Sequence, residues 1–243
     1  MHRPLMSHPV SRSWSVYDFI LIWLGGLVGT GLFFALSVAL ESQDWTIVLS
    51  LAGQFLGSLG VFWILTRHRD VSDIGLTIEA GDFFYVGLGL VLQIAIALLF
   101  LPLSNLLFPE GRPPQEVADI IANADTTFLK VALVASAVVL APVTEELIYR
   151  GVLLRALQSR GKNFAIVVSS VVFTAVHVTG LDSSQMLRSA AVSLPPLFLL
   201  SLVLAWLTLR TGRLGPAIFL HSGFNLLAAF VLLLPTDIVT QIG

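Results

Sequence analysis

The sequence contains no cysteine and few charged residues. The absence of cysteine excludes disulfide bonds and thiolate metal sites, although it does not identify a cellular compartment. Charged residues make up 12% of the 243 residues, whereas a soluble domain carries about 25%. Hydrophobic residues make up 56%, and the mean hydropathy is +0.90. The composition therefore predicts an integral membrane protein.

Three further features are missing. The formal net charge of −2 gives no indication of nucleic-acid binding. Residues 1–16 lack an apolar core followed by a small-residue cleavage site, so we expect no signal peptide and expect the first helix to direct its own insertion. No internal repeat is present, and no loop is long enough for a second domain. We therefore predict a cytoplasmic tail over residues 1–16 and a single membrane-embedded domain over residues 17–243.

Seven apolar stretches are long enough to cross a bilayer, which takes about 20 residues. They are Tyr17–Leu40, Thr46–Thr66, Phe83–Phe108, Thr127–Leu154, Phe164–Gly180, Ala191–Leu209 and Leu214–Leu234. The sequence thus predicts an all-α fold, a polytopic membrane helix bundle of about seven transmembrane helices. The stretch GRPPQEVADIIANAD at residues 111–125 adds the option of an eighth, short amphipathic helix.

Basic residues gather in alternate loops of this bundle. They are Arg3, Arg12, Arg67, Arg69, Arg155, Arg160, Lys162, Arg210 and Arg213. The loops of the opposite side carry only Arg112 and Arg188. Since basic residues mark cytoplasmic loops, we predict a multi-pass protein of the cell membrane with its N-terminus in the cytoplasm and its C-terminus outside.

The stretch GGLVGTG, residues 25–31, places small residues four positions apart in the first predicted helix. Gly25 and Gly29 share one helix face, and such spacing lets helix backbones approach closely in membranes. We expect packing against another helix, with dimerisation as the alternative.

The fourth apolar stretch contains three charged residues in LAPVTEELIYR, residues 140–150. An ionised side chain at mid-bilayer costs about 2.5–3.5 kcal/mol on insertion scales, so pairing, a wet cavity or protonation must offset it. Glu146 and Arg150 are four residues apart with the acid first, the favourable order for an ion pair. Glu145 lies about 100° away around the helix. We expect Glu146 and Arg150 to support the structure and Glu145 to face another group.

Few other polar side chains lie within the predicted spans. They include His177 in the fifth, and His221 and Asn225 in the seventh. With Glu145 they suit hydrolysis, because a carboxylate or imidazole deprotonates water while hydrogen-bond donors stabilise the oxyanion. Glu145, His177 and His221 also suit a divalent metal such as Zn, although asparagine would be a poor ligand beside them. Either no cofactor or one divalent metal fits these residues.

Three motifs, EELIYR, FTAVH and HSGFN, follow one another on these predicted helices. They fit Glu-Glu-x-x-x-Arg, Phe-x-x-x-His and His-x-x-x-Asn, and in this order they resemble the CPBP family of CAAX proteases and bacteriocin-processing enzymes, also called the Abi family. The resemblance covers about residues 127–234 and implies intramembrane cleavage of a membrane-associated peptide or protein. It implies that Glu145 is the general base, that His177 helps to hold the water, and that His221 and Asn225 support the oxyanion.

The resemblance also implies that Glu146 and Arg150 hold the site in shape, in agreement with the helix geometry. The segment DIGLT, residues 73–77, is similar to a segment of that family. Within the family, metal-dependent and glutamate-type schemes are both represented, so metal dependence stays open here. We expect the site to open toward the cytoplasmic side.

The depths of the site residues set a condition on the fold. If the spans are straight and centred, His177 lies roughly 12 Å from the depth of Glu145 and His221, at about 1.5 Å per helical residue. We therefore expect the fifth span to be tilted or displaced, or the fourth helix to continue to about Gln158.

Two other functions compete with proteolysis. One is a non-catalytic immunity or scaffold protein, and the other is a proton-coupled transporter. The lack of an inverted repeat disfavours the transporter, and the complete set of polar residues disfavours an inactive pocket. The enzyme hypothesis requires Glu145, His177, His221 and Asn225 to converge around one water-sized space.

Overall fold

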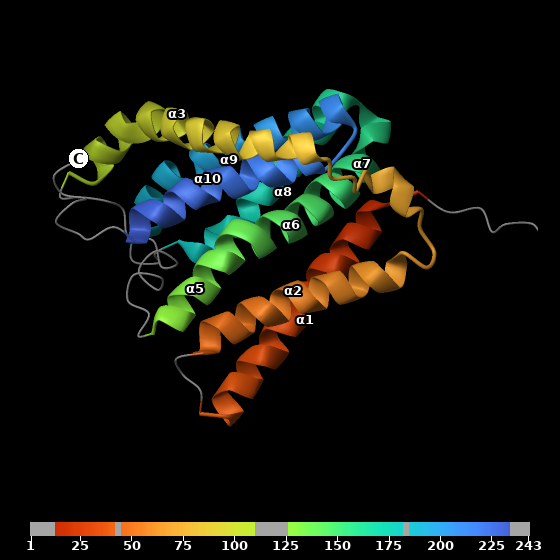
Figure 1. Cartoon of the computed structure of the whole chain (residues 1–243), viewed down its shortest axis with the longest axis horizontal. Helices are drawn as coiled ribbons and strands as arrows, with labels where there is room; N and C mark the ends of the chain where they lie inside the picture. The colour runs from red at the N-terminus through yellow and green to blue at the C-terminus, as the bar shows by residue number, and fades with distance from the viewer. Residues whose placement is uncertain (1–12, 42–44, 110–125, 182–184, 234–243) are drawn as a thin grey trace, which may run out of the picture.

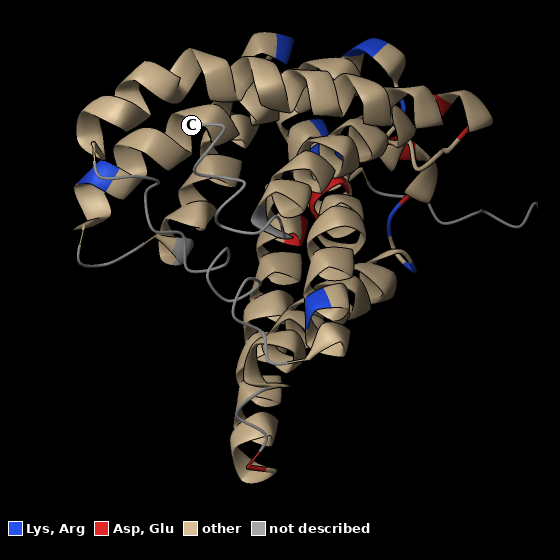
Figure 2. Ribbon diagram, turned by 60° about the vertical axis from the view of Figure 1, so that its left-hand side comes forward, with Lys and Arg blue, Asp and Glu red and all other residues tan. Residues whose placement is uncertain are grey.

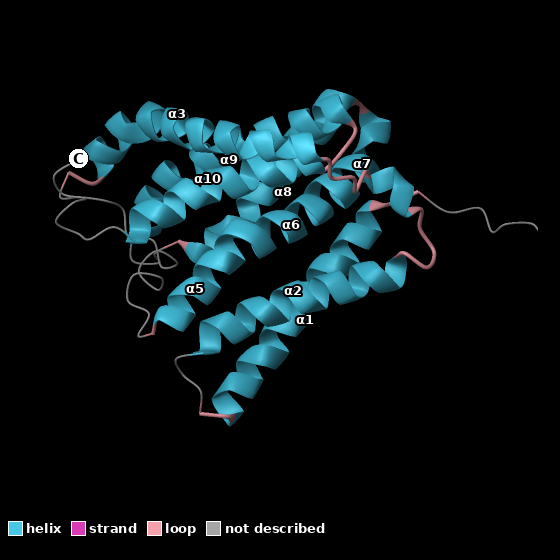
Figure 3. Ribbon diagram, in the orientation of Figure 1, coloured by secondary structure: helices cyan, strands magenta, loops and turns pink. Residues whose placement is uncertain are grey.

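The computed structural model describes residues 13–41, 45–109, 126–181 and 185–233. All regular elements of these residues are helices, as Figure 3 shows. This confirms the predicted all-α fold. The expected short helix at residues 111–125 and most of the expected N-terminal tail lie outside the described residues.

The predicted spans correspond to helices with similar limits. The first three and last three are α1 (Val16–Ala39), α2 (Thr46–Leu65), α3 (Phe84–Leu107), α8 (Lys162–Val176), α9 (Met186–Thr211) and α10 (Gly215–Leu233). Short 3-10 turns cover Val71–Ile74, Ala80–Phe83, Gln158–Arg160 and His177–Gly180. The last of these follows α8 directly, so the fifth span ends in a tighter turn.

The fourth predicted span is a continuous run of α-helix that is interrupted by two π-helical parts. Its α-helical parts and its two π-helical parts are, in order, α5 (Thr127–Ala135), Ser136–Leu140, α6 (Ala141–Glu145), Glu146–Leu153 and α7 (Leu154–Leu157). The run ends at Leu157 and the 3-10 turn follows at Gln158. This confirms the expectation that the fourth helix continues to about Gln158.

Among the described residues, six helical stretches are long and apolar enough to cross a membrane. The seventh, Gly215–Val231 of α10, is apolar but shorter. Figure 2 shows long stretches of the helices without a charged residue. The chain is therefore a multi-pass membrane protein by length and composition.

The helix ends that follow or precede the basic loops meet at one end of the bundle (Figure 1). Arg69, after α2, forms an ion pair of 2.8 Å with Asp18 in the first turn of α1. Arg155 of α7 donates a hydrogen bond of 2.9 Å to the carbonyl of Gly212, which follows α9. The structure thus groups the basic loops as the sequence does, while the side of the membrane that they face stays a prediction.

Glycines hold α1 and α2 together as a hairpin. A Cβ atom at Gly29 would overlap the carbonyl oxygen of Gly53, and a Cβ atom at Gly57 would overlap that of Gly25. Because only glycine permits this approach, the two backbones lie in direct contact. The expectation of helix packing for Gly25 and Gly29 is confirmed, since their partner lies in the same chain.

A second backbone contact joins α3 to α10. A Cβ atom at Gly223 would overlap the carbonyl oxygen of Val86, and one at Gly89 would overlap that of Leu220. Gly223 lies between His221 and Asn225 of the HSGFN motif. The contact with α3 therefore fixes the back of the helix that carries both motif side chains.

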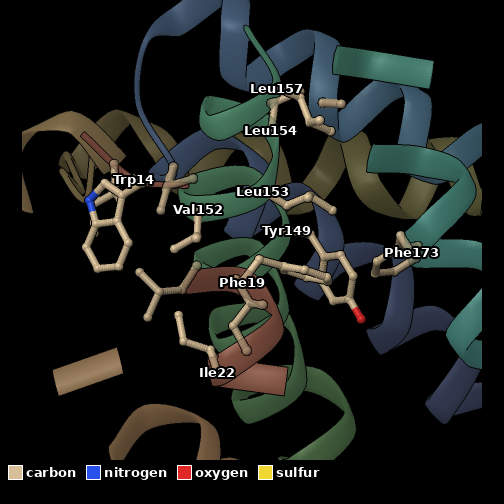
Figure 4. Close-up of a cluster of buried hydrophobic side chains, with 14 of the residues drawn as sticks. Trp14, Phe19, Ile22, Tyr149, Val152, Leu153, Leu154, Leu157 and Phe173 are labelled. Carbon is tan, nitrogen blue, oxygen red and sulfur yellow. The ribbon is translucent and has the colours of Figure 1, made fainter. Parts of the chain in front are cut away.

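The largest buried cluster joins the start of α1 to the π-helical segment Glu146–Leu153. In Figure 4 the ring of Tyr149 lies between Phe19 of α1 and Phe173 of α8. The ring centroids are 5.5 Å apart for Phe19 and 5.2 Å apart for Phe173, both in edge-to-face geometry, which is a favourable aromatic arrangement. The N-terminal hairpin is thus anchored to the helix that carries the acidic pair.

Candidate active site

Pro142 changes the winding of the helix just before the acidic pair. The amide of Ala141 donates to the carbonyl of Ser136, five residues earlier. In that register the carbonyl of Ala137 needs the amide of residue 142, and proline has no N–H. The carbonyl of Ala137, the second residue of the π-helical part Ser136–Leu140, is therefore left without a helical donor. Such π-helical segments occur frequently at functional sites.

Asn225 supplies the missing donor from α10. Its Nδ2 donates a hydrogen bond of 2.8 Å to the carbonyl oxygen of Ala137. A carboxamide has two N–H donors, so the second remains after this bond. The motif asparagine thus ties α10 to the helix of Glu145 through the carbonyl that Pro142 leaves free.

Glu146 and Arg150 form the expected ion pair, with 3.0 Å between Oε1 and Nη1. Both side chains are buried, with 0% and 1% of their surface exposed. Nη1 of Arg150 has no hydrogen-bond partner among the described residues. The two groups therefore attract each other as charges, without the alignment of a hydrogen bond. The pairing offsets the cost of placing either charge alone in an apolar interior.

Two further groups hold the guanidinium of Arg150. Its Nη2 donates a hydrogen bond of 2.9 Å to the hydroxyl of Ser201 in α9. Its central carbon lies 4.5 Å from the ring centroid of Phe173, which is a cation–π distance. The phenylalanine of the FTAVH motif therefore contributes the face on which the arginine rests.

His221 lies between the two carboxylates. Its Nδ1 is 2.9 Å from Oε1 of Glu146, and its Nε2 is 3.9 Å from Oε2 of Glu145. An ionised carboxylate only accepts hydrogen bonds, so Nδ1 carries the proton and the ring orientation is fixed. Glu145 keeps 26% of its side chain exposed, whereas His221 keeps 4%. The imidazole thus contacts Glu146, which forms the ion pair with Arg150, and lies beside Glu145, which stays outside that pair.

His177 packs against Phe173, which also contacts His221. Its Nδ1 is 2.8 Å from the carbonyl oxygen of Phe173, which can only accept, so Nε2 of the neutral ring is an acceptor. The ring centroid of Phe173 lies 4.7 Å from that of His177 and 6.0 Å from that of His221. The phenylalanine therefore packs against both histidines.

The predicted metal set is not assembled in the described residues. Among them, no three His, Asp or Glu side chains lie close enough to hold one metal ion. Glu145 and His221 approach each other, and His177 and His221 each pack against Phe173. The donors Glu145, His177 and His221 thus do not fit a shared metal ion in this arrangement.

Several contributing residues were not evident in the sequence analysis. Ser201 is a single hydroxyl in an apolar helix, and no motif identifies its contact with Arg150. Phe173 belongs to a motif, but its position under the guanidinium depends on how α8 packs. Pro142 was a visible signal, because proline inside a helix removes a donor.

Comparison with known proteins places these motifs in a family. Residues 127–227 match the family described as type II CAAX prenyl endopeptidase Rce1-like. An Escherichia coli protein described as an uncharacterized 24.3 kDa protein is 29% identical over 196 residues, which cover 79% of this chain and 73% of that protein. No solved structure matches the chain.

All three motifs fall within the matched residues, from the acidic pair to the histidine–asparagine pair of α10. Members of the family are proteases, so a protein substrate follows from membership. Residues 127–227 therefore form a domain of the Rce1-like, type II CAAX prenyl endopeptidase (CPBP) family.

Proposed function

We propose that this chain is an intramembrane endopeptidase in which Glu145 activates the water that cleaves a peptide bond. One observation carries the proposal. Glu145 is the member of the acidic pair that stays outside the ion pair with Arg150, and its Oε2 lies 3.9 Å from Nε2 of His221. The site thus holds one neutralised glutamate and one that is free to exchange a proton.

Glu145 acts first as a base and then as an acid. Its carboxylate takes a proton from water, and the hydroxide oxygen bonds to the carbonyl carbon of the substrate. The same carboxyl group then gives the proton to the amide nitrogen as the C–N bond breaks. Nε2 of His177, an acceptor when the ring is neutral, takes the hydrogen bond of the second water hydrogen and holds the water in place.

His221 and Asn225 stabilise the oxyanion. Glu146 holds the His221 ring through Nδ1, and a doubly protonated ring then donates from Nε2. Asn225 uses one N–H for the carbonyl of Ala137 and the other for the oxyanion. Donors of this kind contribute roughly 2.7–4 kcal/mol of transition-state stabilisation each when they are preorganised.

The substrate that we propose is a membrane-associated peptide or protein. It reaches the site from the side where the basic loops gather, which we predict to be cytoplasmic. On the helix of the acidic pair, the carboxylate of Glu145 is partly exposed, whereas Glu146, paired with Arg150, is fully buried. Access to water from that side lets a peptide bond enter a polar space without crossing hydrocarbon.

The test compares cells that carry the native chain with cells that carry Glu145→Gln. N-terminal peptides of membrane proteins are quantified by mass spectrometry, and the native chain is expected to yield new termini that Glu145→Gln does not. His177→Ala is expected to lose the same products while inserting normally. Glu41→Gln is the control, because Glu41 is an exposed carboxylate just after α1.

Two results would contradict the proposal. If Glu145→Gln and the native chain yield the same termini, Glu145 is not the base. If neither the native chain nor Glu145→Gln yields termini that differ from those of cells without the chain, and both forms protect cells equally from a membrane-active peptide, the chain is a scaffold or immunity protein. A proton current in vesicles that depends on Glu145 would instead support the transporter.

A further inference from the structure

The turn between α9 and α10 is held by the segment that precedes α3. We propose that residues 74–82 cap the start of α10 and thereby set the position of His221, with Asp82 and Arg213 as positioning residues. The effect on catalysis rests on the proposed function, whereas the placement of α10 does not.

The backbone of the segment caps α10. The amide of Leu214 donates to the carbonyl of Gly75 at 2.8 Å, and the amide of Gly215 donates to the carbonyl of Thr77 at 3.3 Å. The first amides of a helix have no partner within it, and Pro216 has no amide hydrogen. No side chain of the α9–α10 turn performs this capping, so a distant part of the chain satisfies the start of α10.

A partly buried ion pair holds the cap in place. Arg213 donates two hydrogen bonds to Asp82, from Nη1 at 2.9 Å and from Nη2 at 3.0 Å. These bonds raise the pKa of Arg213, and a bidentate arginine–carboxylate pair has a defined geometry. Asp82 is 1% exposed. A Cβ atom at Gly215 would overlap Oδ2 of Asp82, so the helix begins with glycine where the carboxylate approaches.

Residues 74–82 also contact the helix that carries Glu145 and Glu146. Ile74 is fully buried, and a Cβ atom at Gly151 would lie 3.3 Å from its Cβ and 3.3 Å from Cδ1 of Leu214. Gly151 is the residue after Arg150, within the π-helical segment. Arg155, one turn further on, donates to the carbonyl of Gly212. Residues 74–82 therefore join the helix of the acidic pair to the start of α10.

The junction lies close to the site along the chain. His221 follows Gly215 by six residues, about 9 Å of helix. A helix transmits a shift of its first turn along its axis, and the contact of Gly223 with Val86 prevents rotation. A displaced cap therefore changes the 3.9 Å between Nε2 of His221 and Oε2 of Glu145, and small displacements of reacting groups lower rates strongly.

The chain contains a matched control for the ion pair. Asp18 is buried, is the third residue of a capping box and pairs with Arg69 at 2.8 Å. Asp82 has the same arrangement with Glu79 as the cap and Arg213 as the partner. Asp18 caps α1, and the hydrogen-bond partners of its carboxylate, Ser15 and Arg69, lie outside α10. A purely structural role predicts equal behaviour of Asp18→Asn and Asp82→Asn.

The experiment measures hydrogen exchange by mass spectrometry on the full chain in lipid nanodiscs. Asp82→Asn is expected to raise exchange at least tenfold in residues 214–221, and Asp18→Asn is expected to raise it only at the start of α1. Arg213→Lys, which keeps the charge but loses the bidentate geometry, is expected to give an intermediate rise. Glu41→Gln, which removes an exposed carboxylate just after α1 and outside this junction, is expected to match the native chain.

Kinetics on the same samples test the positioning role, with a fluorogenic farnesylated CAAX peptide as the probe. Asp82→Asn is expected to lower kcat about tenfold with KM within twofold, and Asp18→Asn is expected to change neither. Unchanged exchange in residues 214–221 overturns the cap, and raised exchange with native kcat overturns the positioning role. If the native chain leaves the probe intact and also yields no new termini in cells, the proposed function fails, and the exchange data still decide the cap.

Discussion

The α1–α2 hairpin and the centre between α6, α8 and α10 hold helices together in opposite ways. In the hairpin, Gly29 brings backbone against backbone along the helices, and polar contacts such as that of Ser37 with Thr46 lie near the hairpin's ends. In the centre, Glu146 is buried and contacts both Arg150 and His221. The first kind of contact depends mainly on shape, and the second depends on completing charges and hydrogen bonds. The difference teaches that this fold separates its scaffold from its chemistry, and substitutions can test that separation.

Glu146→Ala is expected to give the largest effect. It leaves Arg150 and His221 without their shared partner, and breaking a buried ion pair costs about 3–5 kcal/mol. We expect a loss of folded yield as well as activity, measured by size-exclusion chromatography in detergent. Glu145→Ala, at the exposed member of the pair, is expected to keep the yield. Equal losses of yield for both would contradict the division of roles.

Gly223→Ala tests a place where the two kinds of contact meet. The added methyl group overlaps the carbonyl of Val86, and overpacking costs about 1–3 kcal/mol. Because Gly223 lies between His221 and Asn225, we expect a lower melting temperature and a lower kcat. Gly87→Ala in α3 is the control, since a Cβ atom there meets nothing within 4 Å. An unchanged kcat would mean that α3 does not position α10.

Gly29→Ala tests the hairpin alone. The methyl group overlaps the backbone of Gly53, so we expect the free energy of unfolding to fall by about 1–3 kcal/mol. The melting temperature falls, but the activity of the folded fraction stays native because the site is elsewhere. Gly31→Ala, on the same helix but in open space, is expected to be neutral. Loss of specific activity in Gly29→Ala would show that scaffold and chemistry are not separate.

Ser201→Ala is expected to give the smallest effect. It removes the hydroxyl that accepts from Arg150, and hydrogen bonds of this kind contribute about 0.6–1.7 kcal/mol in membranes. Ser193→Ala is the control on the same helix, because its buried hydroxyl has no hydrogen-bond partner. We expect thermal melting to distinguish the two. A larger cost at Ser193 would contradict the assigned contact.

The sequence predicts the fold better than it predicts the site. Apolar length determines the spans, which is why their limits agree with the helices within a few residues. The order and spacing of Glu146 and Arg150 predict their ion pair, because a helix brings residues four apart together. The junction of Asp82 with Arg213 is different, since it joins residues 131 positions apart. No local pattern encodes that contact, or the packing of Phe173 against both histidines.

The orientation of Glu145 also depends on what a neighbour lacks. Pro142 has no amide hydrogen, and the helix before it is wound so that the amide of Ala141 reaches five residues back. Every residue downstream is consequently turned about the axis relative to an uninterrupted α-helix. Pro142→Ala would let the carbonyl of Ala137 bond within its own helix and leave the amide of Asn225 without an acceptor there. A single missing proton on one nitrogen thus aims the carboxylate three residues later.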